Sequence, residues 1–277
     1  MSENNRVWLI TGANSGFGRA LTEAAIAAGD VVVATARRPG TLAELVAAHP
    51  DQVDAVRLDV TDADAAATVV ADVERRYGRI DVLVNNAGRG QVGAAEETTD
   101  DELRSLFEVH VFGPAALVRA VLPGMRARGN GAIVQFSSFG GQVAYPGFSA
   151  YCATKFALEG YSEALAAEVG PLGIRVLIVE PGAFRTSFSG GGLLESRSLP
   201  AYESTVGPTR TMIKGVDGSQ PGDPAKAAAA ILTALDADST PLRLPLGDDA
   251  VDGIITHLDG VRTELAAWEK VSRATSF

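Results

Sequence analysis

The sequence predicts an α/β fold with a doubly wound parallel sheet, in a single domain that spans residues 1–277. Short runs rich in Val and Ile alternate with Ala-rich stretches of helical length. The runs are almost continuously apolar, which is typical of parallel strands covered by helices on both faces. Hydrophobic residues make up 46% of the chain, which is enough to bury one large core, and no linker or internal repeat divides it.

Seven strands are expected in chain order, with helices or loops between them. Their ranges are 7–10, 31–35, 53–58, 82–84, 132–136, 176–179 and 242–246. Residues 187–222 break this pattern, because they hold several glycines and show no sustained hydrophobic period. A long structureless loop in a compact domain is typical of a lid, so we expect a substrate lid there. A helix that begins at Pro224 and an amphipathic helix that ends near Trp268 complete the domain.

Composition excludes several classes of protein. The net charge of −10 disfavours binding to nucleic acid or to an anionic membrane. Cys152 is the only cysteine, so no intramolecular disulfide can form, and His49, His110 and His257 lie too far apart in sequence to suggest a metal site. No signal peptide and no apolar run of the roughly 18 residues that a membrane span needs is evident. We therefore expect a cytoplasmic protein without a metal.

A glycine-rich loop follows the first strand, with the sequence TGANSGFG. Glycines at such a turn let a backbone approach a pyrophosphate, and the N-terminus of the next helix offers free N–H groups. A tight turn without a ligand is the alternative, but the surrounding strand–helix–strand unit favours a dinucleotide. The candidate cofactor contacts in this loop are Gly12, Asn14, Ser15, Gly16, Phe17 and Gly18.

Tyr151 and Lys155 are four residues apart, so a helix places both side chains on one face. An ammonium ~4 Å from a phenol, at an effective dielectric of ~20, lowers the phenol pKa by up to about three units. Such a tyrosine is a general acid near neutral pH. Accidental spacing is the alternative, and Ser138 at the end of a predicted strand argues against it.

These motifs together resemble the short-chain dehydrogenase/reductase superfamily. The glycine loop, NNAG at 85–88, the serine of QFSS, YCATK at 151–155 and PGAFRT at 181–186 occur in that family's order, and the resemblance is strong over residues 6–190. It implies a Rossmann-type fold and hydride transfer between a nicotinamide cofactor and a carbonyl or alcohol. Tyr151 would then donate the proton, Lys155 would hold the nicotinamide ribose, and Ser138 would bind the substrate oxygen. Ser137 is the weaker candidate, since neighbouring strand residues face opposite ways.

The resemblance also assigns cofactor contacts beyond the glycine loop. One pair contacts the adenine, the NNAG segment backs the adenine ribose, and PGAFRT surrounds the nicotinamide carboxamide and the diphosphate. The residues at these positions are Asp59, Val60, Asn86, Ala87, Gly88, Pro181, Gly182, Phe184 and Thr186. Phe184 stands where a smaller aliphatic residue is common, so we expect it to reshape the pocket floor.

Cofactor choice is decided after the second strand. Ala36 stands at the position of the family's acidic residue, and Arg37 and Arg38 follow it. A carboxylate there repels a 2′-phosphate, whereas an arginine can grip one with a forked contact. NADP is therefore expected rather than NAD. The alternative is that both arginines are merely solvated on an exposed turn.

His110 departs from the family, which usually has a catalytic asparagine in the segment that here reads FEVHVFG. Two hypotheses remain open. The ring replaces the amide in a proton relay, as a group titrating near ~6.5 can do. Alternatively, it is a hydrogen-bonded core histidine, because it shares a helical stripe with apolar residues.

The sequence thus predicts an NADP(H)-dependent oxidoreductase that interconverts a carbonyl and an alcohol on a hydrophobic substrate, with reduction the expected direction. An apolar pocket is expected from Val143, Tyr145, Phe148, Phe184, Phe188, Leu193, Leu194, Leu199 and Tyr202. The family commonly forms homodimers or homotetramers through the helix of Tyr151 and Lys155. A non-catalytic NADP-sensing protein of the same fold is the alternative function, and an epimerase or dehydratase of the extended type is less compatible with the chain length and glycine spacing.

Overall fold

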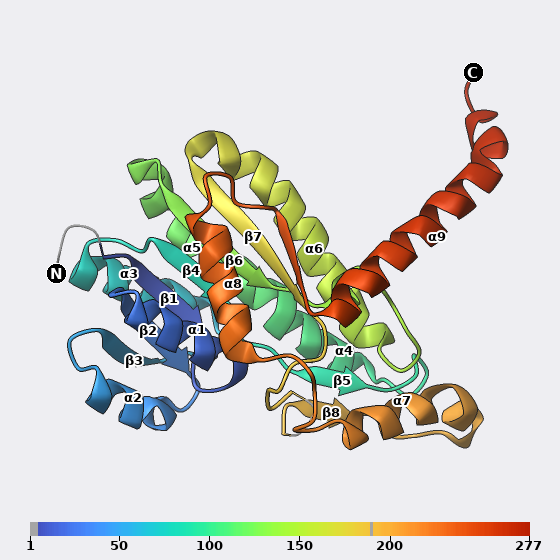
Figure 1. The fold of residues 1–277 in the computed structure, drawn as a ribbon, viewed down its shortest axis with the longest axis horizontal. Helices are drawn as coiled ribbons and strands as arrows, with labels where there is room; N and C mark the ends of the chain where they lie inside the picture. Colours follow the sequence, from blue (N-terminus) through green and yellow to red (C-terminus); the bar gives the residue numbers. More distant parts are fainter. Residues whose placement is uncertain (1–4, 189–190) are drawn as a thin grey trace.

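A seven-stranded parallel sheet runs through the centre of the computed structural model, which describes residues 5–188 and 191–277 (Figure 1). The strand order is β3-β2-β1-β4-β6-β7-β9. The strands are β1 (Val7–Thr11), β2 (Val31–Ala36), β3 (Val53–Arg57), β4 (Val82–Asn85), β6 (Gly131–Phe136), β7 (Ile174–Pro181) and β9 (Arg243–Leu246). All seven predicted strands are present, and the doubly wound α/β prediction is confirmed.

Helices cover both faces of this sheet because its strands are apolar on both sides. On one face α1 (Gly16–Ala27) and α8 (Pro224–Asp236) pack against Trp8 and Ile10 of β1. On the other face α3 (Ala63–Tyr77), α5 (Gly113–Arg128) and α6 (Ser149–Val169) pack against Val7 and Leu9. This alternation along a single strand produces two cores, one on each side of the sheet.

All seven strands are parallel, so their carboxyl ends meet at one edge of the sheet, where ligands bind in such folds. The glycine loop follows β1, NNAG follows β4, the two serines follow β6, and PGAFRT begins at the end of β7. The topology therefore gathers these four motifs at the same edge.

A long helix precedes β6. It runs as α4 (Asp100–Phe107), a π-helical turn (Glu108–Phe112) and α5. Among the described residues, Asp100–Arg128 is the one helix long and apolar enough to cross a membrane, yet half of its most apolar window is buried within the fold. Its packing against α3, β4 and β6 accounts for this composition.

The segment 187–222 is not structureless, and that part of the prediction is wrong. It contains β8 (Leu193–Glu195), a short 3₁₀ turn (Pro200–Tyr202) and α7 (Glu203–Gly215), while residues 189 and 190 lie outside the described residues. β8 pairs in parallel with β5 (Gly90–Val92) in a second small sheet. No helical signal was visible in the sequence here because Gly207 and Pro208, two poor helix formers, lie inside α7.

The last helix, α9 (Asp248–Arg273), projects away from the body of the molecule (Figure 1). Only its first turns pack on the body, through the buried residues Ala250 and Ile254. The helix ends five residues beyond the predicted boundary at Trp268.

Candidate active site

Tyr151 and Lys155 lie in the first turns of α6 and are both buried. The Lys155 ammonium donates a hydrogen bond to the backbone carbonyl of Phe136, at 2.8 Å, and lies over the Tyr151 ring, 5.7 Å from its centroid. Phe136 is the last residue of β6. This bond therefore fastens the helix that carries the tyrosine to the carboxyl end of a central strand.

Ser138 follows β6 and faces the same tyrosine. Its hydroxyl forms a hydrogen bond with the Tyr151 phenol and accepts another from the backbone N–H of Gly140, at 3.0 Å. Ser137 points the other way, where its buried hydroxyl lies beside Gly141 and Glu159 and forms no hydrogen bond among the described residues. The structure thus brings Ser138, Tyr151 and Lys155 together, as the sequence predicted, and leaves Ser137 aside for the reason of strand alternation.

Burial dominates the electrostatics of this group. It raises the pKa of Tyr151 to about 12, although the bond from Ser138 acts in the opposite direction, and it lowers the pKa of Lys155 to about 8. The prediction that Lys155 brings the phenol close to neutral pH is wrong for this arrangement. The ammonium lies over the ring and is engaged by the Phe136 carbonyl, while water is excluded from the hydroxyl. Tyr151 is therefore a fully protonated phenol at neutral pH.

His110 is buried in the π-helical turn, and protein groups occupy both ring nitrogens. Nε2 accepts a hydrogen bond from the backbone N–H of Arg89, at 3.2 Å, and Nδ1 lies 2.8 Å from the hydroxyl of Thr154. That hydroxyl donates to the carbonyl of Tyr151, so Nδ1 carries the proton and donates to Thr154.

The ring is accordingly neutral. Burial and the charges of Lys155 and Arg89 hold the pKa of His110 well below its usual value. The relay hypothesis needed a ring that titrates near neutral pH, and this ring does not. His110 instead joins the loop after β4 to the first turn of α6, and its ring meets that of Tyr151 edge-on, with centroids 5.7 Å apart.

The glycine loop is shaped for close approach. Gly12 and Gly16 adopt positive φ angles of 63° and 54°, which side chains rarely tolerate. A Cβ on Gly18 would collide with the carbonyl of Gly12, so the first turn of α1 packs tightly on the loop. Asn14 and Ser15 are exposed at the entrance to α1, and the Ser15 side chain forms no capping bond within the described chain.

The NNAG segment braces this loop from the neighbouring strand. The Asn86 amide donates to the carbonyl of Thr11, at 2.8 Å, and the backbone N–H groups of Asn86 and Ala87 donate to the Thr11 hydroxyl. Gly88 packs against the ring of His110. These contacts assign the segment a structural part in holding the loop, beside the ribose contact that the family resemblance implies.

Arg37 and Arg38 are both exposed after β2, at the carboxyl edge of the sheet. Nearby, Asp59 accepts hydrogen bonds from the backbone and hydroxyl of Thr61, and Val60 is buried against α5. Although partial burial raises it, these bonds and the charges of Arg37 and Arg57 lower the pKa of Asp59.

Arg89 was missed by the sequence reasoning, although it directly follows NNAG. It lies close enough to Arg37 and Asp59 for their charges to act on it. Its side chain donates to the hydroxyl of Ser105, at 2.5 Å, and its buried Nε meets no acceptor among the described residues. A third arginine thus borders the predicted phosphate end of the site.

The PGAFRT segment is held by the start of α9. The Asp249 carboxylate accepts a hydrogen bond from the backbone N–H of Ala183, at 2.7 Å, and lies against Gly182. Pro181 closes β7, and Thr186 packs against Gly16 of the glycine loop. The two motifs therefore meet, as a shared diphosphate site requires.

Phe184 packs within an aromatic cluster beside the glycine loop. Its ring packs on Phe17, with centroids 5.0 Å apart, and Phe17 in turn packs on Phe136. Both side chains are thus drawn into the core on the α1 side of the sheet.

An apolar cluster covers Tyr151. Phe148 and Phe188 meet its ring edge-on, with centroids 5.7 and 5.6 Å away, and Tyr145, Leu193 and Ile213 complete the cluster. Phe188, Leu193 and Ile213 come from the segment expected to be a lid. Leu194, by contrast, is 45% exposed, so only part of the predicted apolar set gathers here.

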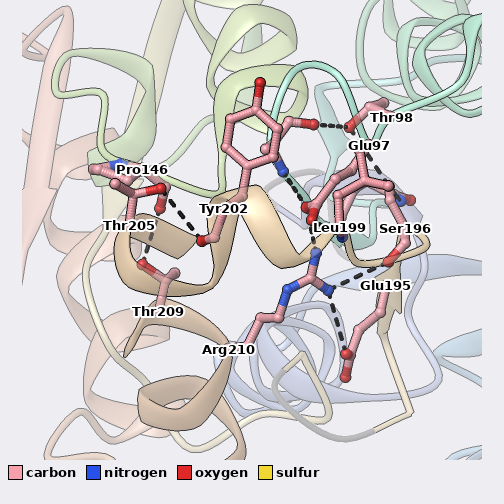
Figure 2. A network of polar contacts seen from close by, with 12 residues as sticks. Glu97, Thr98, Pro146, Glu195, Ser196, Leu199, Tyr202, Thr205, Thr209 and Arg210 are labelled. Carbon is pink, nitrogen blue, oxygen red and sulfur yellow. Dashed lines mark hydrogen bonds and ion pairs between the residues drawn. The ribbon is translucent and has the colours of Figure 1, made fainter. Parts of the chain in front are cut away.

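A polar network fixes the covering segment to the body (Figure 2). Arg210 of α7 forms ion pairs with Glu97, at 2.5 Å, and with Glu195, at 3.6 Å. Glu97 also accepts the backbone N–H of Leu199, and the Tyr202 hydroxyl donates to Glu96. The backbone of Leu199 and the hydroxyl of Tyr202 thus anchor the segment by polar bonds.

The residues at this edge fit a dinucleotide. The open turn at Gly12–Gly16 leaves space for a diphosphate, and the free N-terminus of α1 offers N–H donors to it. The exposed side chains of Arg37 and Arg38 add positive charge. Comparison with known protein families identifies the family. The family model for short chain dehydrogenases matches residues 6–191 of this sequence. The chain belongs to the short-chain dehydrogenase family.

Known proteins similar to this dehydrogenase agree in fold and class. A crystal structure of a short-chain dehydrogenase from Streptomyces avermitilis is 64% identical, with all of both chains covered and a TM-score of 0.95. Oxidoreductase BOA17 of Botryotinia fuckeliana is 36% identical over 98% of this chain and 99% of its own. An alcohol dehydrogenase of Thermococcus sibiricus complexed with 5-hydroxy-NADP is 26% identical, with 88% and 96% covered and a TM-score of 0.71. The chain is thus an oxidoreductase with a Rossmann-type fold.

The dehydrogenase also holds a buried carboxyl pair beneath Lys155 that sequence reasoning missed. Gln142 donates to Glu180, at 2.5 Å, and Arg243 forms an ion pair with Glu159, at 3.1 Å. Burial raises the pKa of both carboxyls, that of Glu180 to about 7. One oxygen of each finds no donor among the described residues, so a proton shared between the two satisfies both. No cluster of His, Cys, Asp and Glu within the described residues could hold a metal.

The structure predicts that His110→Leu lowers stability without removing a proton relay. The Arg89 N–H and the Thr154 hydroxyl lose their partner in a buried place, which costs about 1–3 kcal/mol for each unsatisfied group. We expect a lower Tm, turnover within tenfold of wild type and an unchanged pH profile between pH 5.5 and 8.

His110→Asn is the matched variant, since its amide can keep one of the two hydrogen bonds of the His110 ring. Its Tm should fall between that of the wild type and that of His110→Leu. Thermal unfolding and steady-state turnover measure both effects. A stable His110→Leu protein whose turnover falls ten- to a hundredfold would restore the relay.

Proposed function

We propose that this dehydrogenase is an NADP(H)-dependent reductase of hydrophobic ketones or aldehydes that acts in the cytoplasm. The observation that carries the proposal is the buried Tyr151 phenol, bonded to Ser138, beside Lys155 and under an apolar cover. A non-catalytic sensor of the same fold has no need of this arrangement.

The site residues divide the work of carbonyl reduction. The Ser138 hydroxyl lies next to the Tyr151 phenol, so both can donate a hydrogen bond to the same substrate oxygen. When bound, the reduced nicotinamide supplies a hydride to the carbonyl carbon. Tyr151 then gives its proton to the oxygen, and burial favours this direction because it keeps the phenol protonated.

Lys155 holds the geometry and the charge. One of its three N–H groups is committed to the Phe136 carbonyl, which leaves two for the nicotinamide ribose and for the phenolate that forms when Tyr151 loses its proton. Its positive charge therefore acts mainly after proton transfer. His110 and Thr154 keep the first turn of α6 in place beneath these groups.

The preference for NADP rests on Arg37 and Arg38, with Arg89 behind them and no carboxylate at Ala36. A 2′-phosphate there would meet positive charge from two sides. The similar Thermococcus enzyme was crystallised with an NADP derivative, which agrees with this preference.

The hydrophobic substrate class follows from the cover over Tyr151. A substrate must displace Phe188, Leu193 and Ile213 to reach the phenol, so segment 187–222 is proposed as the lid. An apolar substrate replaces the contacts that these side chains lose. We also propose the family's assembly through α6, where Phe156 is 43% exposed, in a homodimer or homotetramer.

Tyr151→Phe should fold and bind NADPH with wild-type affinity but lose at least a hundredfold in turnover, because only the proton donor is removed. The measurement is NADPH oxidation across a panel of hydrophobic ketones and aldehydes. Tyr145→Phe is the control, since it removes a hydroxyl from the same apolar cluster and should stay active. Turnover of Tyr151→Phe within tenfold of wild type contradicts the mechanism, and tight NADPH binding without any turnover by the wild type favours a sensor.

Replacing Arg37 and Arg38 with Ala and Ala36 with Asp should reverse the preference from NADPH to NADH. Charge-assisted bonds to the 2′-phosphate account for about 2–4 kcal/mol, a change of roughly 30- to 700-fold in the ratio of kcat/KM values. Arg75→Ala, an exposed arginine on α3, is the control and should leave the ratio unchanged. Equal use of both cofactors by the wild type would refute the preference.

A further inference from the structure

Two buried carboxyls, those of Glu159 and Glu180, lie side by side beneath Lys155, and the proposed reaction makes no use of them. Glu159 stands on α6, four residues after Lys155, and Glu180 is the penultimate residue of β7. Their side chains are 6% and 0% exposed. Burial on this scale is costly for a carboxylate, so the surroundings must supply either a partner or a proton.

One cation serves both carboxyls. The Nε of Arg243 lies 3.1 Å from Glu159 and 3.6 Å from Glu180. The other arm of this guanidinium is engaged by Glu163, an exposed residue on the next turn of α6. Burial raises the pKa of both carboxyls of the pair, that of Glu180 to about 7, and like charges in contact act in the same direction. The pair therefore retains one proton below neutral pH.

The hydrogen bonds indicate where that proton lies. Oε2 of Glu159 faces Arg243, and Oε1 of Glu180 accepts a hydrogen bond from the amide of Gln142, at 2.5 Å. The second oxygen of each carboxyl meets no donor among the described residues. A proton on Glu180 supplies a donor to Glu159, so the negative charge stays on Glu159, beside the arginine.

The pair also supports the turn that follows Ser138. The Ser138 hydroxyl accepts a hydrogen bond from the backbone N–H of Gly140, at 3.0 Å. A Cβ on Gly141 would lie 3.0 Å from both Cγ and Oε1 of Glu159, so this glycine rests directly on that carboxyl. Gln142 is bonded to the other carboxyl. The Ser138 hydroxyl is thus tied to a turn whose next two residues rest on the pair.

The charge of the pair acts on Lys155. Lys155 and Glu159 are one helical turn apart on α6, so both side chains lie on one face. Burial lowers the pKa of Lys155 to about 8, and the charge of Glu159 opposes this shift. The other contacts of the ammonium, the Phe136 carbonyl and the Tyr151 ring, are uncharged. Glu159 therefore supplies negative charge that helps to keep the buried ammonium protonated.

We propose that Glu159 and Glu180 are positioning residues of the reductase, which act as a pair that holds one proton. With that proton, the pair fixes the turn after Ser138 and leaves one negative charge beside Lys155. Without it, two buried carboxylates repel each other, the turn loosens, and the Ser138 hydroxyl leaves its place beside Tyr151. This role presupposes the function proposed above for Ser138, Tyr151 and Lys155, and the pair itself gives no proton to the substrate.

Two substitutions of equal size separate the parts of this role. Glu180→Gln gives Glu159 an N–H donor that cannot be lost, so the pair never carries two charges. Glu159→Gln moves the negative charge to Glu180, whereas it is Glu159 whose charge acts on Lys155. A contact that served only to fill space would respond to both changes in the same way. The proposed role predicts different responses to pH.

The measurement is kcat for NADPH oxidation between pH 6 and 9.5, with a ketone or aldehyde that the wild type reduces. We expect the wild-type kcat to fall above pH 7, where the pair loses its proton. In Glu180→Gln the fall should move up by about one pH unit or more, since a neighbouring charge shifts a pKa by about 1–3 units. In Glu159→Gln it should stay at or below the wild-type pH, because Lys155 has lost a supporting charge.

Glu163→Gln is the control for these variants. This glutamate binds the other arm of Arg243 but is exposed, so its substitution should leave the kcat profile of the wild type unchanged. A profile of Glu180→Gln that does not move up, or profiles of both pair variants that move in the same direction, overturns the proposal. The proposed function is tested separately, because Tyr151→Phe remains inactive in either case.

Thermal unfolding tests the shared proton without the reaction. Folding raises the pKa of Glu180 from its ordinary value of 4.5 to about 7, so the folded state binds more protons and wild-type stability falls as pH rises between these values. Glu180→Gln removes this dependence, so its Tm relative to that of the wild type should increase between pH 5 and pH 8. A Tm difference that stays constant over this range would show that no proton is shared, and overturns the proposal.

Discussion

The hydrogen bond between the buried ammonium of Lys155 and the carbonyl of Phe136 is the constraint on which the site depends. A buried cation is costly unless it is bonded, so this contact fixes where α6 can lie relative to the end of β6. Tyr151, one turn away, then meets Ser138, the second residue after the strand. His110 and Thr154 reinforce the same helix turn from the other side. The catalytic geometry is thus a consequence of joining one helix to one strand.

The same burial decides the proton chemistry. Water excluded by Phe148, Phe188 and Leu193 keeps Tyr151 a phenol with a pKa of about 12, and holds Lys155 near 8. The site therefore stores a proton for delivery to a carbonyl oxygen. Oxidation of an alcohol would require the phenolate, which this environment disfavours. Because the proposed lid contacts Tyr151, a substrate that enters must displace the lid's side chains. Their displacement changes the polarity around the phenol.

The sequence predicted those features of the fold and the site that depend on hydrophobic periodicity and on the spacing of motifs. Buried parallel strands read as apolar runs, and the motifs after β1, β4, β6 and β7 had to meet because parallel strands end at one edge. It could not supply what depends on packing between distant residues. The partners of His110 come from Arg89 and Thr154, Phe184 packs on Phe17, and Glu180 lies beside Glu159 of another element. The tyrosine pKa was misjudged because spacing reports the lysine but not the side chains that exclude water.

The central claim is that Tyr151 is a buried phenol that remains protonated at physiological pH. Ultraviolet titration of the protein without cofactor measures this directly, when the tyrosinate absorption of Tyr151→Phe is subtracted from that of the wild type at each pH. The account predicts that the difference signal stays flat through neutral pH and rises only above the ordinary tyrosine pKa of ~10. A difference signal that rises to one full tyrosinate between pH 6 and 8 would contradict it.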